Sequence, residues 1–302
     1  MRPLTAWLLK AACTAVLLTW LLTRAEVRGG LQSLGHLTPG WLLIGFLTAG
    51  VSQVFAAWRW QVCLRTAGVP LPFVSVFRFT LMSTAAGFLS IGTLGADAVR
   101  VGLGVQRRPT QKTALLGSIG LDHASGIPAF IGMALVVLST AGLSFDAGSW
   151  TGVAVLGAIA CFIMIGLVLR RFRPGLHDRL RDFLLERRTR AGLAKAALLS
   201  VPVMLTHFAV FFCAARALGV KVPPVPFAAA AATADIAAAL PVTIAGLGVR
   251  EKAFETLLGL WQGVPAASAI ALSLAGLGLV LLWGLAGAIC FLAEPVKPVP
   301  PT

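Results

Sequence analysis

Charged side chains are scarce in this sequence. Asp, Glu, Lys and Arg together make up 12% of its 302 residues, whereas hydrophobic residues make up 58%. Soluble domains carry about 25% charged residues, and one soluble core could not bury this much apolar surface. The composition therefore excludes an ordinary soluble protein and predicts an integral membrane protein.

The sequence also lacks the residue groupings of metal, disulfide and catalytic sites. Its cysteines lie singly in or beside apolar runs: Cys13, Cys63, Cys161, Cys213 and Cys290. Their spacing is that of neither a disulfide framework nor a metal site. The sequence has no His/Cys/Asp metal cluster, no nucleophile elbow and no acidic pair on a long loop for a metal-bound sugar donor. We expect no metal and no cofactor, and an enzyme is the less favoured interpretation.

Acidic residues are outnumbered by basic ones, and the net charge is +14. The cations lie between apolar runs, and no aromatic-basic motif of an RNA or DNA binder accompanies them. We therefore expect the anionic face of a lipid bilayer as the partner, and no nucleic acid.

Apolar runs are abundant, and six are long enough to cross about 30 Å of hydrocarbon. They cover residues 4–23, 39–58, 113–141, 150–169, 193–215 and 265–292. The first run, with its basic start and short apolar core, is also compatible with a signal peptide; a snorkelling Lys10 favours a span. Two further apolar stretches, 73–91 and 227–245, either span the membrane or enter and return.

The distribution of cations orients these runs. Residues 170–195 hold nine Lys or Arg against three acids, so the positive-inside rule places this loop in the cytoplasm. Residues 92–112 and both termini then also lie inside. Because both flanks of 73–91 are cytoplasmic, this stretch is predicted to be an arm of a re-entrant hairpin, which must be buried by other helices.

A weak internal repeat supports this topology. "RTAGVPLPF" at 65–73 recurs as "RALGVKVPPVPF" at 216–227, and each copy precedes an apolar stretch. The predicted halves are 39–145 and 193–292. An odd number of spans between them inverts the second copy, as in many transporters. Chance recurrence of Pro/Gly loops is the alternative.

The predicted fold is therefore an all-α polytopic membrane protein with a single transmembrane domain over 1–292. It has six spanning helices and two re-entrant hairpins in inverted repeats, or alternatively eight spanning helices. Within it, 170–190 has one apolar stripe among arginines, which predicts a helix on the membrane surface or else a solvated linker. Residues 293–302 form a Pro-rich tail.

Two glycine-bearing motifs are the candidate substrate sites, "GADAVR" at 95–100 and "GLGVRE" at 246–251. Gly92 and Gly95 would permit a tight turn whose returning helix presents free N–H groups to an anion, with Asp97 in its first turn. An arginine offers a planar fork to a phosphate. The candidate substrate-binding residues are Gly95, Asp97, Arg100, Gly246, Gly248, Arg250 and Glu251. Alternatively, the arginines cap the interface or pair with Asp97 and Glu251.

Two acids lie inside apolar runs, Asp122 and Asp235. An ionised acid at a helix centre costs roughly 2.5 to 3.5 kcal/mol on insertion scales, so each needs a partner or a function. Pairing with Arg100, Arg250 or Arg78 is one interpretation. Proton coupling of transport is the other, and His123 would join such a relay.

Several motifs, in this order, resemble the lysylphosphatidylglycerol synthase transmembrane family, also called flippase-like domain proteins. They are "RW" at 59–60, "GV" at 68–69, "GADAVR" at 95–100, "SIGLDHASG" at 118–126 and "LPVTIAGLGVRE" at 240–251. The chain departs from the family's usual Asp-Arg at Asp122-His123, which removes a fixed cation, and from its Gly-Gly-Asp at Gly95-Ala96-Asp97.

This resemblance implies a multi-pass protein of the prokaryotic plasma (inner) membrane. The implied function is transport of an anionic or polyprenyl-phosphate lipid between leaflets. The alternative is an accessory subunit or membrane enzyme of envelope lipid or polyprenyl-linked glycan synthesis, with an envelope-biosynthesis enzyme as partner. Lysyl-transferring members carry a soluble domain after the membrane part, whereas this sequence ends at "AEPVKPVPPT", so aminoacyl transfer is not expected.

Overall fold

A computed structural model of the chain describes residues 38–89, 93–140, 171, 186–239 and 246–293. Within these ranges the regular structure is entirely helical, which confirms the predicted all-α membrane fold. The helices are α3 Pro39–Thr66, α4 Phe73–Leu89, α5 Thr93–Arg107, α6 Lys112–Thr140, α9 Arg187–Ala217, α10 Pro224–Ala239, α11 Val249–Gln262 and α12 Ala266–Ala293. A short 3-10 turn, η2 Pro109–Gln111, precedes α6.

Four of these helices, α3, α6, α9 and α12, are long and apolar enough to cross a membrane. They correspond to four of the six predicted spans. The other two predicted spans, 4–23 and 150–169, lie outside the described residues.

The predicted re-entrant stretches each begin with a short apolar helix. The 17 residues of α4 and the 16 residues of α10 are fewer than the roughly 20 that cross a bilayer. Each is followed by a second short helix, α5 or α11, that packs against it. The order long, short, short, long thus occurs twice along the chain.

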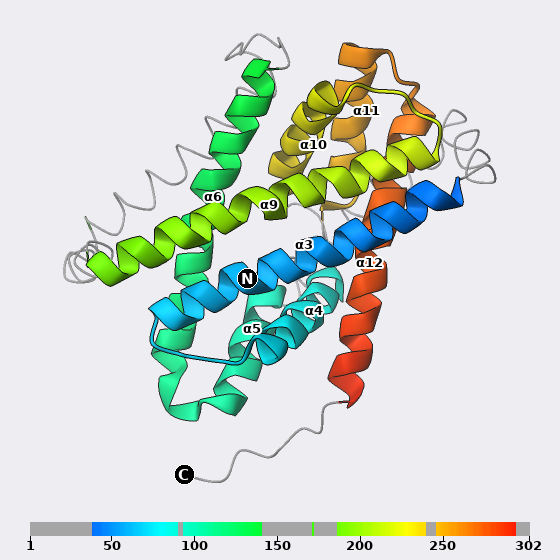
Figure 1. Cartoon of the computed structure of the whole chain (residues 1–302). Helices are drawn as coiled ribbons and strands as arrows, with labels where there is room; N and C mark the ends of the chain where they lie inside the picture. Colours follow the sequence, from blue (N-terminus) through cyan, green and yellow to red (C-terminus); the bar gives the residue numbers. More distant parts are fainter. Residues whose placement is uncertain (1–37, 90–92, 141–170, 172–185, 240–245, 294–302) are drawn as a thin grey trace.

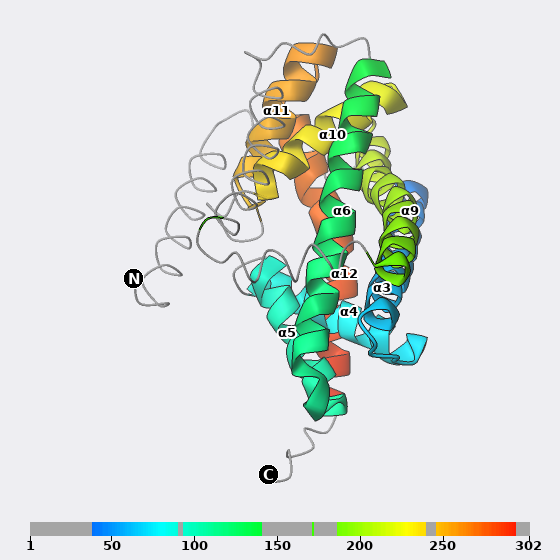
Figure 2. The same ribbon diagram turned by 90° about the vertical axis from the view of Figure 1, so that its left-hand side faces the viewer.

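The first set of helices, α3 to α6, and the second set, α9 to α12, run in opposite directions. Helices α3 and α9 run side by side and antiparallel (Figure 1), since the Thr38 N–H donates to the Ala217 carbonyl at one end and Arg188 Nη2 donates to the Arg65 carbonyl at the other. Figure 2 shows the α4–α5 pair and the α10–α11 pair toward opposite ends of α6. Each set has its own core, one around Trp60 and one around Phe254.

The repeated motif ends α3 and α9 in the same way. Gly68 and Gly219 take positive φ angles of 85° and 73°, which other residues adopt at a cost. The following N–H groups bond back into the last helical turn, from Val69 to the Leu64 carbonyl at 2.8 Å and from Val220 to that of Ala215 at 2.9 Å. This glycine-dependent cap turns the chain toward the short helices.

Glycines also bring the helices close together. A Cβ added at Gly287 of α12 would lie 2.0 Å from the backbone oxygen of Leu81 in α4. A Cβ at Gly50 of α3 would lie 2.3 Å from the Trp283 ring of α12. Small residues at such crossings allow the close backbone approach that associates helices in membranes.

The basic segment predicted over 170–190 lies mostly outside the described residues. Its end is described, and there Arg187 begins α9, a 31-residue helix that continues to Ala217. Residues 187–190 are therefore the first turn of a long apolar helix, and the surface helix over the rest of the segment stays a prediction. The apolar run that begins at 193 had marked only the hydrophobic part of α9.

Candidate functional site

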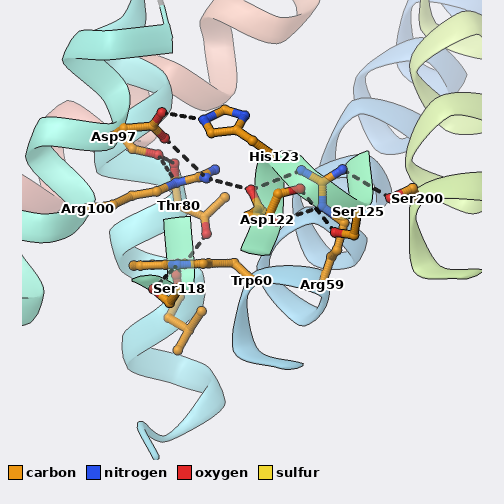
Figure 3. Close-up of polar contacts among 12 residues, drawn as sticks. Arg59, Trp60, Thr80, Asp97, Arg100, Ser118, Asp122, His123, Ser125 and Ser200 are labelled. Carbon is orange, nitrogen blue, oxygen red and sulfur yellow. Dashed lines mark hydrogen bonds and ion pairs between the residues drawn. The ribbon is translucent and has the colours of Figure 1, made fainter. Parts of the chain in front are cut away.

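A buried carboxylate, Asp122 of α6, is the centre of a polar cluster within the first set of helices (Figure 3). Its side chain is 2% exposed. Arg59 of α3 donates to both carboxylate oxygens, from Nε at 2.8 Å and from Nη2 at 3.1 Å. Arg100 of α5 adds a third bond from Nη1 at 3.3 Å. A charge this deeply buried is tolerated because it is paired and hydrogen-bonded.

Other helices hold the two arginines in place. Arg100 Nε donates to Ser83 Oγ of α4 at 3.1 Å, and Arg59 Nη1 donates to Ser200 Oγ of α9 at 3.3 Å. The Arg100 guanidinium also lies over the Trp60 ring, 5.2 Å from its centroid. The cluster therefore connects α3, α4, α5, α6 and α9 through one carboxylate.

His123 and Asp97 form the more exposed side of this cluster. His123 Nε2 lies 2.7 Å from Asp97 Oδ2, and the side chains are 44% and 16% exposed. Asp97 Oδ1 lies 3.8 Å from Arg100 Nη1. His123 thus pairs with the acid of α5, not with its neighbour Asp122.

The start of α5 differs from the prediction. The helix begins at Thr93, so Gly95 lies inside its first turn and not in the connection to α4. Asp97 lies beyond the first turn, which contains no acid. Asp97 therefore does not orient the free N–H groups at the helix start, because its carboxylate is taken up by His123 and Arg100. Gly92 lies outside the described residues.

The second set of helices contains a related cluster around Asp235 of α10. Arg250 Nε of α11 donates to Asp235 Oδ1 at 3.2 Å, and His207 Nε2 of α9 lies 2.9 Å from Oδ2. The Arg250 guanidinium lies 5.7 Å from the Phe211 ring centroid. Both clusters thus combine a histidine, an aspartate and an arginine.

The two aromatic rings that lie under these arginines, Trp60 and Phe211, occupy matching positions in the repeat. Trp60 precedes Arg65 by five residues, and Phe211 precedes Arg216 by five. Arg65 and Arg216 begin the two copies of the repeated motif. Arg100 and Arg250 each follow a valine at the second short helix of their set. In each set, therefore, an arginine of the second short helix lies over an aromatic ring of the first long one.

Glu251 is a cap, not an exposed ligand for substrate. Its side chain is fully buried, accepts the Gly248 N–H at 2.5 Å and accepts Ser273 Oγ at 2.9 Å. At the start of α11 the Gly248 N–H group is thus already bonded to a carboxylate of the chain itself. Gly246 and Gly248 take φ angles of 73° and 86°, so they are required by the backbone of this turn.

A cavity of about 200 Å³ lies between the two sets of helices and includes Arg250. It is lined by Thr84, Gly87, Phe88, His207, Phe211, Arg250, Leu277 and Val280. Arg250 Nη1 is buried and has no hydrogen-bond partner within the described residues. A buried donor without an acceptor is costly, so Arg250 has capacity for one further acceptor.

The sequence predicts Arg100, Arg250 and Arg78 as candidate partners of the two acids without assigning the pairs. In the structure Arg100 pairs with Asp122 and Arg250 pairs with Asp235. Sequence reasoning missed Arg59 and His207 as partners, and Arg78, the other predicted partner, is exposed on α4. Arg59 ends an apolar run and opens the "RW" motif, which was the available signal. Across the described ranges, no group of three His, Cys, Asp or Glu side chains could hold a metal ion.

Comparison with known proteins identifies the family of the chain. The family described as "Lysylphosphatidylglycerol synthase TM region" matches residues 7–288. No curated protein matches the chain. Since the match covers nearly all of the sequence, the chain belongs to the lysylphosphatidylglycerol synthase transmembrane family and is a multi-pass membrane protein with a lipid-related function.

Proposed function

We propose that this protein moves an anionic phospholipid or a polyprenyl-phosphate lipid between the leaflets of a prokaryotic plasma membrane. The observation that carries the proposal is Arg250. It lines a cavity between the two sets of helices and has a buried Nη1 without an acceptor among the described residues. A phosphate oxygen would complete its hydrogen bonding as a charge-assisted pair.

The rest of the cavity suits the headgroup region of a lipid. Its volume of about 200 Å³ accommodates a phosphate and its ester oxygens, not a whole lipid. Phe88, Phe211, Leu277 and Val280 make most of the lining apolar, which suits the start of acyl or prenyl chains. The chains themselves would remain in the bilayer, where they pay no cost of transfer to water.

The two arginine clusters differ in their bonding, which supports alternating use. Arg100 is bonded to Ser83 and Asp122, whereas Arg250 bonds one carboxylate and keeps a free donor. We infer that the halves are an inverted repeat and that each arginine receives the same phosphate in a different state. Interrupted helices at a repeat interface are the usual location of transporter binding sites.

We infer the orientation in the membrane from the cations on the described helices. Arg65, Arg107, Arg108, Lys112, Arg187, Arg188 and Arg190 lie where α3 and α5 end and where α6 and α9 begin. Arg216 and Lys221 lie toward the opposite end, where α9 ends. By the positive-inside rule the first end, with the end of α12, faces the cytoplasm.

Reconstitution tests the proposal. The full chain is placed in phosphatidylcholine vesicles with trace fluorescent phosphatidylglycerol, and a membrane-impermeant reductant reports how fast inner-leaflet lipid becomes accessible. We expect transport by the wild type. Arg250→Lys should be at least about tenfold slower, since lysine keeps the charge but lacks the planar fork and the stacking on Phe211.

The matched control is Lys195→Gln, which removes an exposed cation from α9 away from the cavity and should transport like the wild type. Normal transport by Arg250→Lys would make Arg250 a structural group. If the wild type moved no lipid while retaining phosphatidylglycerol during purification, the role of accessory subunit or membrane enzyme in envelope lipid synthesis would replace transport.

A further inference from the structure

A second cavity lies where α3 begins, α9 ends and α10 begins. Its volume is about 430 Å³, within the range of small-molecule sites. Its lining residues are Trp41, Phe212, Arg216, Gly219, Lys221 and Pro224. None of these belongs to the Asp122 or Asp235 cluster, so the cavity is separate from the candidate transport site.

Two cations line this cavity, and one of them is held in a fixed position. Arg216 Cζ lies 4.9 Å from the Phe212 ring centroid, and Arg216 Nη2 donates to the Val222 carbonyl at 3.4 Å. Its other N–H groups have no partner among the described residues. Lys221 is exposed and lies two residues after Gly219, whose φ of 73° forms the turn at the end of α9. No lining residue is acidic, so the cavity offers donors to an anion.

The aromatic part of the lining matches the membrane interface. Trp41 lies in the first turn of α3 and is 39% exposed. Exposed tryptophans at the ends of spanning helices favour the headgroup region of a bilayer. Next to it, exposed Leu43, Ile44 and Leu47 continue along α3 as a surface for acyl chains. The cavity thus joins a cationic pocket to an apolar helix face.

The position of these cations is unusual within the molecule. They lie at the end that carries fewer basic residues, where the positive-inside rule does not account for them. The first copy of the repeated motif has Pro70 where the second has Lys221. The repeat accounts for Arg216, whose counterpart in the first copy is Arg65. Neither membrane topology nor the repeat accounts for Lys221, and this favours a ligand.

We propose that this cavity binds the phosphate of an anionic phospholipid, with Arg216 and Lys221 as the charged contacts and Trp41 beside the glycerol region. Binding does not depend on the proposed transport. Only the assignment of this cavity to the outer leaflet depends on the orientation given above. A lipid held here would occupy the junction of the antiparallel helices α3 and α9.

The test measures lipid binding to the full chain in neutral detergent. Short-chain phosphatidylglycerol or phosphatidylcholine is titrated in, and native mass spectrometry counts bound lipids per chain. We expect preferential binding of phosphatidylglycerol, and roughly tenfold weaker binding at one site in the double variant Arg216→Gln, Lys221→Gln. Because Arg216 also bonds the Val222 carbonyl, Lys221→Gln alone, at an exposed position, serves as the second variant. It should weaken the same site.

Two control variants and two contrary outcomes complete the test. Lys195→Gln should bind like the wild type, and Arg250→Gln should keep this site even if it loses transport. Unchanged phosphatidylglycerol binding by Lys221→Gln and by the double variant would overturn the proposal. Displacement of the lipid by inorganic phosphate at similar concentration would also overturn it, because the cavity would then be a site for a soluble anion.

Discussion

Arg100 and Arg250 have the same place in the two motifs, yet their surroundings differ. Arg100 is bonded on α4 and α6, and a second arginine, Arg59, shares its carboxylate. Arg250 has one carboxylate, shared with His207, and lines a cavity. The first cluster is therefore a structural connection between helices in this conformation, and the second has unused capacity for an anion.

The Asp122 cluster predicts a large loss of stability when the carboxylate is neutralised. Asp122→Asn would leave the cations of Arg59 and Arg100 without their shared anion, in surroundings of low dielectric. We expect a loss of about 3 to 5 kcal/mol, measured as thermal unfolding of the detergent-solubilised protein. Adding Arg59→Gln should restore part of the loss, since one stranded charge is removed. An unchanged melting temperature would contradict the ion-pair role.

Asp235 gives a different expectation, because its partners are one arginine and one histidine. If it carries a proton during transport, Asp235→Asn mimics the protonated form. We then expect a smaller loss of stability than for Asp122→Asn, and lipid movement that no longer responds to a proton gradient. Both readouts come from one preparation. A destabilised variant that keeps its gradient dependence would leave Asp235 as an ion-pair partner only.

At the scale of elements, glycines permit several of the closest helix–helix contacts. Gly287 of α12 lies against the backbone of α4, and Gly50 and Gly276 accommodate the rings of Trp283 and Phe211. The Gly287 contact attaches the short helix α4 of one set to the long helix α12 of the other, the Gly50 contact joins α3 to α12, and the Gly276 contact joins α12 to α9. The position of the cavity beside Phe88 follows from the attachment of α4 to α12.

The α4–α12 contact predicts which glycine substitution is tolerated. Gly287→Ala would place a Cβ 2.0 Å from the Leu81 oxygen and within 2.8 Å of the Met82 nitrogen. The helices would have to separate, which we expect to cost about 1 to 3 kcal/mol. Gly278→Ala on the same helix has no heavy atom within 4 Å of its new Cβ and should be neutral. Equal melting temperatures for the two variants would exclude this contact.

The sequence predicted elements better than it predicted contacts. Apolar runs located α3, α6, α9 and α12 because length and hydropathy are local properties. The run at 193–215 missed the start of α9 because Arg187, Arg188 and Arg190 are polar yet helical. Periodicity carries no information about such a charged first turn.

The polar clusters around Asp122 and Asp235 were predictable only in part, because contacts between helices are not a local property of the sequence. That Asp122 needs a cation follows from its apolar neighbours, but the choice of Arg59 depends on how α3 crosses α6. A Cβ added at Gly126 would lie 3.0 Å from Arg59 Nη1, so the glycine leaves room for this guanidinium where the helices cross. Likewise, Asp97 was expected in the first turn because Gly92 and Gly95 were assigned to the tight turn before the helix. The helix instead begins at Thr93, and local sequence fixes helix starts poorly.

For the whole molecule, the antiparallel pairing of α3 with α9 gives two sets of helices of opposite direction. Their short pairs, α4–α5 and α10–α11, end far apart along α6 (Figure 2). A phosphate bound near Arg100 and one bound near Arg250 would then approach from opposite leaflets. This arrangement makes the inverted topology a requirement of the proposed transport.

Cysteine accessibility tests that topology in the intact membrane. Single cysteines replace Gly102 of α5 and Gly259 of α11 in a background without the five native cysteines. Neither position is tightly packed, since a Cβ meets nothing within 4 Å at Gly102 and only the Val264 carbonyl oxygen, at 3.7 Å, at Gly259. We expect a membrane-impermeant thiol reagent to label Gly259→Cys in intact cells and Gly102→Cys only in inverted vesicles. Labelling of both from the same side would rule out the inverted repeat, and with it alternating exposure of the two arginines.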